Sequence, residues 1–226
     1  MQPKRSRKYR RREITTGLVI LLVAFSFLAA LLLDFNFVSP YASLQEDLSY
    51  LSDHIVNQRI SVYLWLGTAL LILIAIPLFL ATFHQRLRFL HYLDALLLVG
   101  ASGSFLMMAV KGFELHQIML QTQASGLDQT DEASRVLLLE KFREEQHFRY
   151  IGSSLIGLFA IGLGLIRIRI TNFPAFAAVL LLLSGPVLVF FNWYDPDHLA
   201  RTVAMAGVML GVAIVAVRMI NKGLSP

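Results

Sequence analysis

Residues 4–34 decide the fold class of this chain, and they read KRSRKYRRREITTGLVILLVAFSFLAALLLD. Seven of the first nine residues in this stretch are Lys or Arg, whereas residues 17–33 contain no charged side chain. A helix needs about 20 mostly apolar residues to cross a hydrocarbon core of about 30 Å. Residues 15–36 meet that length. The stretch therefore predicts a membrane-spanning helix that follows a basic segment.

Five further stretches have the same apolar character. They lie at residues 61–83, 89–112, 150–170, 173–193 and 198–219. Hydrophobic residues make up 56% of the chain and charged residues 15%, whereas soluble domains contain about 45–50% and about 25%. These values exclude a water-soluble globule and a disordered chain. We predict an all-α, polytopic membrane bundle of six transmembrane helices, formed as one domain over residues 15–219.

The charged residues predict how the bundle is oriented. Cytoplasmic flanks of membrane helices are enriched in Lys and Arg. If the basic segment 1–14 is cytoplasmic, the inner side collects 13 basic and 2 acidic residues, against 7 basic and 13 acidic residues outside. Both termini, 1–14 and 220–226, are then predicted to be cytoplasmic, in the inner (plasma) membrane. The net charge of +5 follows from this topology, so no nucleic-acid partner is expected.

The apolar run 17–33 also raises the question of a cleaved signal peptide. It is long for such a peptide, and no small-x-small cleavage pattern precedes Asp34. We predict a retained signal anchor.

Two outer segments, 37–60 and 113–149, connect the spans. In the first, Leu44, Leu48, Leu51 and Ile55 have helical spacing, which predicts a short amphipathic helix over residues 43–60 on the membrane surface. The second has the turn-prone pair Ser125 and Gly126, and no helix breaker after Asp131. It is predicted to continue as a helix into the span 150–170. Its apolar residues lie on several sides, so it should pack against the first outer helix, the bundle or a partner subunit.

Small residues form stripes on two spans. Such residues let helices in lipid approach closely, because apolar side chains gain nothing by leaving apolar lipid. The stripes predict a helix-packing surface within the chain or an interface with a partner or a second copy, and they consist of Ser153, Gly157, Ala160, Gly164, Ala200, Ala204, Gly207 and Gly211.

A proline near the centre of the span 173–193 predicts a kink, because proline removes a backbone donor and clashes with the preceding turn. Kinked or broken helices expose backbone groups to substrates in many transporters. The alternative function is therefore a small transporter or a lipophilic-ligand-binding protein, with a cavity lined by Ser102, Ser104, Ser184, Gly185 and Pro186.

Ionisable residues lie near the ends of the spans. Spacing places Asp94 on one helix face with His91, and Lys111 with Glu114; such pairs anchor helix ends. Glu144 and His147 also share a face, but di-metal bundles need two Glu-x-x-His pairs and further carboxylates. The chain has no cysteine and no histidines near the middle of two spans. We therefore expect no metal, no cofactor and no catalytic residues.

The layout combines residues 47–59 leading into 61–83 with a long second outer segment feeding 148–170. In these features it resembles a family of uncharacterised six-span bacterial membrane proteins with a domain of unknown function. The resemblance implies a bacterial inner membrane and transfers no functional residue. The leading hypothesis is a non-enzymatic accessory or scaffolding subunit, with membrane lipids and other membrane-protein subunits or a second copy of the chain as partners.

Overall fold

The computed structural model describes residues 7–35, 55–83, 88–125, 132–169, 174–194 and 199–224. Within these ranges the chain is all-helical, and the helices are α1 (Arg7–Phe35), α3 (Ile55–Phe83), α4 (Arg88–Ser125), α5 (Glu132–Arg169), α6 (Ala175–Tyr194) and α7 (Leu199–Leu224). Each of these six helices is long and apolar enough to cross a membrane. The predicted six-span, all-α bundle is confirmed.

Two helices begin earlier than predicted. α1 starts at Arg7, so part of the basic segment is helical. α3 starts at Ile55, so residues 55–60 continue the second span instead of ending a separate surface helix. No proline or glycine interrupts this stretch, and extending a helix is easier than nucleating a new one. The rest of the predicted surface helix, residues 43–54, lies outside the described residues.

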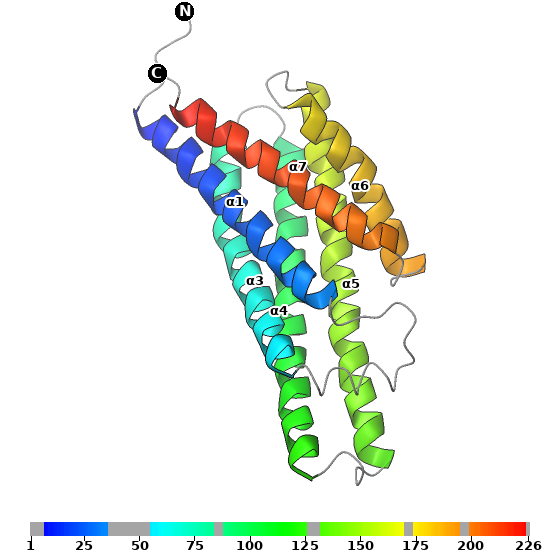
Figure 1. Cartoon of the computed structure of the whole chain (residues 1–226). Helices are drawn as coiled ribbons and strands as arrows, with labels where there is room; N and C mark the ends of the chain where they lie inside the picture. Colours follow the sequence, from blue (N-terminus) through cyan, green and yellow to red (C-terminus); the bar gives the residue numbers. More distant parts are fainter. Residues whose placement is uncertain are drawn as a thin grey trace, which may run out of the picture.

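The six helices close into a ring. Each helix packs against the next along the chain, and α7 packs against α1. The start of α1 and the end of α7 lie together at one end of the bundle (Figure 1), as an even number of spans requires.

Aromatic rings fill the centre of the bundle. Phe27 of α1, Trp65 of α3 and Phe105 of α4 are fully buried. Their ring centroids lie 4.9–5.5 Å apart. Gly152 of α5 faces the Phe105 ring, and an added Cβ there would lie 2.7 Å from it. Interlocking shape is what holds this core together, since lipid offers no hydrophobic driving force.

The first and last helices are joined near the chain termini. A Cβ at Gly17 would lie 2.8 Å from the carbonyl oxygen of Ala216, so the α1 and α7 backbones are in close contact. Beside this contact, Glu13 Oε1 lies 3.2 Å from Lys222 Nζ. The ion pair offsets the burial of the Glu13 carboxylate.

α4 and α5 are much longer than a membrane is thick. Each has 38 residues, which is about 57 Å at 1.5 Å per residue, against a hydrocarbon core of about 30 Å. They extend together beyond the other helices at the end opposite the termini (Figure 1). The predicted continuation of the second outer segment into the fourth span is confirmed by α5. The matching extension of α4 to Ser125 was not predicted.

Candidate functional site

The extended parts of α4 (111–125) and α5 (132–149) form a unit that we call the outer hairpin, after the predicted outer segment 113–149. A small apolar cluster holds its two helices together, and it consists of buried Leu115, Met119 and Leu138 with Leu33, Ile118 and Phe142 packed around them. Leu138 and Phe142 thus pack against α4, which is one of the packing partners predicted for this segment, the bundle itself. Leu33 brings the end of α1 to the same cluster, so the hairpin is fixed to the bundle at its base.

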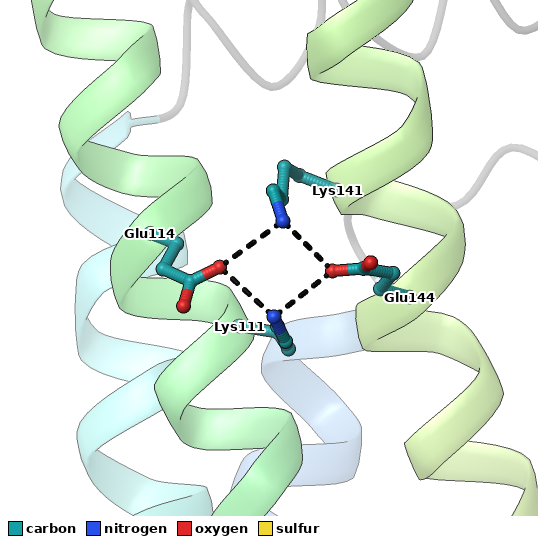
Figure 2. A network of polar contacts seen from close by, with 4 residues as sticks. All are labelled: Lys111, Glu114, Lys141 and Glu144. Carbon is teal, nitrogen blue, oxygen red and sulfur yellow. Dashed lines mark hydrogen bonds and ion pairs between the residues drawn. The ribbon is translucent and has the colours of Figure 1, made fainter.

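Four charged side chains form a closed ring between the two helices of the hairpin (Figure 2). Lys111 Nζ lies 3.1 Å from Oε2 of both Glu114 and Glu144. Lys141 Nζ lies 3.4 Å and 3.0 Å from the same two oxygens. Positive and negative charges alternate around the ring, so every charge has two neighbours of opposite sign. The predicted pairing of Lys111 with Glu114 is confirmed.

A groove opens beside the ring. It has a volume of about 930 Å³ and is lined by Lys111 of α4 and, on α5, by Val136, Glu140, Arg143, Glu144, His147 and Phe148. At one end the His147 ring lies 6.5 Å from the ring of Trp193 on α6. Aromatic residues such as Trp193 concentrate at membrane–water interfaces. The groove thus runs along the hairpin and ends beside the C-terminal turn of α6.

Glu144 and His147 both line this groove, as their shared helix face predicts. Over the described parts of the chain, however, no group of three or more His, Asp or Glu side chains could hold a metal ion. The residues that line the groove present charges of both signs, the His147 imidazole and apolar surface to a binding partner.

A layer of buried polar side chains crosses the bundle near the base of the hairpin. Gln58 of α3 bonds to α4 twice: its Nε2 donates to the Gly112 carbonyl oxygen at 3.4 Å, and its Oε1 lies 3.2 Å from His116 Nδ1. On α5, Glu145 Oε1 lies 3.5 Å from Arg149 Nη2, and both side chains are buried.

The layer continues into α6. The Ser153 hydroxyl donates to the Arg149 carbonyl oxygen at 2.6 Å and lies 3.3 Å from Asn192 Oδ1. Asn192 Nδ2 donates to the Ser154 hydroxyl at 3.1 Å. Sequence reasoning missed this layer. The signal was Asn192, an amide inside an otherwise apolar helix, whose donors and acceptors require partners.

Both small-residue stripes face α6. Gly157 of α5 lies against Gly185, where an added Cβ would come within 3.0 Å of the Gly185 carbonyl oxygen. Further along, Gly164 meets Leu182, and Ala160 is fully buried. On α7, Gly207 meets Ser184 and Gly211 meets Leu181. Ala204 is buried there, whereas Ala200 is half-buried.

The five predicted cavity residues lie in separate places. Ser102 donates to the Ala69 carbonyl oxygen of α3 at 2.9 Å, and Ser104 donates to Gly100 on its own helix at 3.0 Å. Ser184 and Gly185 pack against α7 and α5 respectively, while Pro186 is exposed. α6 remains helical through Pro186. The structure does not bring these residues together around one space.

The surroundings of the Asp94 side chain differ from those that the sequence predicts. His91 and Asp94 share a buried face of α4, but neither carboxylate oxygen of Asp94 makes a hydrogen bond. The expected end-anchoring pair with His91 is therefore wrong. Asp94 is only 1% exposed, so the packed helices shield its carboxyl from solvent.

No family model, curated protein or solved structure matches the chain. Function must be argued from the chain's own residues.

Proposed function

We propose that this integral membrane protein is a non-enzymatic accessory or scaffolding subunit whose outer hairpin binds a partner subunit. The charge distribution supports cytoplasmic termini and a hairpin on the outer side, and the resemblance to six-span bacterial membrane proteins implies an inner (plasma) membrane.

The observation that carries the proposal is a set of exposed apolar side chains on the hairpin, next to charges that should keep it out of the hydrocarbon. Six charged residues between positions 140 and 149 keep this part of α5 out of the lipid, because charges in the membrane interior are strongly disfavoured. Beyond them, Val136 and Leu137 are 57% and 42% exposed, and Leu120 on α4 is 48% exposed. In water, exposed apolar patches of this kind mark interaction sites.

The hairpin is also held rigid. The charge ring and the Leu115–Leu138 contact fix α4 against α5, so little conformational freedom is lost when a partner binds. The adjacent groove is lined by acidic Glu140 and basic Arg143 with apolar Val136. This mixture fits an amphipathic helix of the partner, with apolar side chains on Val136 and flanking charges of both signs.

The membrane-embedded stripes are less available for such a partner. Gly157, Gly164, Gly207 and Gly211 already lie against α6. Once two helices are in contact through their small residues, that surface is covered and does not bind a further helix. Binding through the hairpin leaves these contacts intact.

Photo-cross-linking from single positions tests the proposal. A photoreactive amino acid at Leu137, exposed on the hairpin, should cross-link to one polypeptide of constant mass in native membranes. The matched controls are Leu138, buried one residue further on, and Leu96, exposed on the membrane-spanning part of α4. Leu138 should react within the chain and Leu96 with lipid. A Leu137 probe that reacts only with lipid would contradict the proposal.

A further inference from the structure

The carboxyl of Asp94 has surroundings unlike those of the other buried acids that the structure describes. Glu13 lies 3.2 Å from Lys222, and Glu145 lies 3.5 Å from Arg149. Asp94 has the most buried carboxyl of the three, and both of its oxygens lack a hydrogen-bond partner.

The carboxyl lies where α3, α4 and α5 meet. It is packed directly against Gly162 of α5, where a Cβ would collide with Asp94 Oδ1. One turn earlier on α4, the buried His91 ring lies edge-on to Phe79 of α3, with the centroids 5.8 Å apart. The Phe79 ring in turn meets Phe159 of α5 at 5.9 Å. Aromatic rings and helix backbone thus surround the carboxyl.

Few ionisable side chains lie near the Asp94 carboxyl. On α4 itself the nearest is His91. Residues 64–83 of α3 and residues 151–166 of α5 contain no ionisable side chain. Arg167 and Arg169 follow in the last turn of α5, with side chains outside the described set. An ionised carboxylate here has no hydrogen bond to compensate its transfer from water.

Such a group neutralises itself instead of remaining charged, because burying an unpaired carboxylate is far more unfavourable than binding a proton. We propose that Asp94 is an intramembrane proton-binding site. Its carboxyl carries a proton while α4 and α5 are packed at Gly162, and it releases that proton only when the contact opens. The packing of α4 against α5 is thereby coupled to the proton concentration at the end of the bundle where α4 begins with Arg88. In the proposed topology this is the inner end.

Infrared spectroscopy of the full chain in lipid nanodiscs tests this directly. A protonated carboxyl has a C=O stretch distinct from carboxylate bands, and carbon-13 in the aspartate side chains shifts it. The other aspartates, Asp34, Asp47, Asp53, Asp128, Asp131, Asp195 and Asp197, lie in connecting segments or at the edge of a span. We expect one isotope-sensitive protonated band at neutral pH, absent from Asp94→Asn. Its absence from the wild-type chain, or its persistence in Asp94→Asn, would overturn the proposal.

The wild-type isotope spectrum decides the question even where Asp94→Asn does not fold. Where it does fold, stability gives a second readout. A site that is protonated in the folded state and ionised in the unfolded state loses its contribution as pH rises. The folded-to-unfolded ratio of the wild-type chain should fall by up to about tenfold per pH unit as the pH rises above about 4, where an aspartate of the unfolded chain ionises. For Asp94→Asn this dependence should disappear, and an equal dependence in both chains would count against the site.

Discussion

At the scale of single residues, Gly157 and Gly185 determine how closely α5 and α6 approach. An added Cβ at Gly185 would lie 2.7 Å from the Gly157 carbonyl oxygen, and one at Gly157 would lie 3.0 Å from the Gly185 carbonyl oxygen. Each glycine therefore faces backbone of the other helix, which cannot move aside as a flexible side chain can.

Substituting Gly185→Ala should therefore destabilise the bundle by about 1–3 kcal/mol, the usual range for overpacking. The matched control is Gly103→Ala on α4, where an added Cβ meets nothing within 4 Å; its effect should stay within about 0.5 kcal/mol. Thermal unfolding in a mild detergent measures both. Equal melting temperatures for the two variants would contradict the α5–α6 contact.

The charge ring should respond to reversal of one member. Glu144→Lys places three positive side chains around Glu114 and should speed amide hydrogen exchange in the hairpin several-fold. Inverting all four charges, with Lys111→Glu, Glu114→Lys, Lys141→Glu and Glu144→Lys together, restores the alternation and should restore protection. High salt should narrow the difference, since the ring is partly exposed and salt screens such charges. A slow-exchanging Glu144→Lys hairpin would show that the ring does not hold the helices.

At the scale of elements, the sequence predicts features that lie within one helix. It misses features that arise where two helices meet. The spacing of Lys111 and Glu114 was enough to predict their pairing, and the lack of breakers after Asp131 was enough to predict α5. Lys141 reaches the same ring only through the relative rotation and depth of α4 and α5. The helical extension of α4 to Ser125 also depends on its contact with Leu138, so its polar sequence gave little sign of it.

Substitutions at Leu137 and Leu138 distinguish the two roles of the hairpin, which are internal packing and the proposed binding of a partner. Leu138 is 6% exposed and packs in the apolar cluster with Leu115, so Leu138→Ala should loosen the hairpin by an amount near the 2–5 kcal/mol typical of buried Leu→Ala changes. Leu137→Ala removes an exposed side chain and should leave hairpin exchange unchanged. Amide hydrogen exchange of residues 132–149 measures the effect of each of the two substitutions. Equal loosening by the two variants would contradict the packing of this face.

At the scale of the whole molecule, the helices α1 and α3 to α7 form a closed ring, in which the start of α1 and the end of α7 lie at the same end of the bundle. Hydropathy was sufficient to predict the number of spans, because each spanning stretch is recognisable by itself. The buried polar layer through Gln58 and Asn192 was not predictable, because it joins residues whose proximity arises from the ring closure.

The proposed topology can be checked without removing any native cysteine, because the chain contains none. A cysteine placed at Gln129, in the sequence between α4 and α5, should react with an impermeant maleimide in intact cells. Cysteines at Gln2 and Ser225 should react only after the membrane is permeabilised. Labelling of all three positions in intact cells would show that the termini are not cytoplasmic.

The central claim is that the outer hairpin binds a partner, and native mass spectrometry of the chain extracted with its lipids tests it most directly. The comparison is a chain that lacks residues 120–123 and 134–137, about one helical turn from each arm. This deletion removes the exposed side chains of Leu120, Val136 and Leu137 and keeps the apolar cluster, the charge ring and the spans. We predict an additional polypeptide at fixed stoichiometry on the full chain and none on the shortened chain, with equal melting of the two bundles. A full chain that carries no additional polypeptide, or a shortened chain that retains it, would contradict the account.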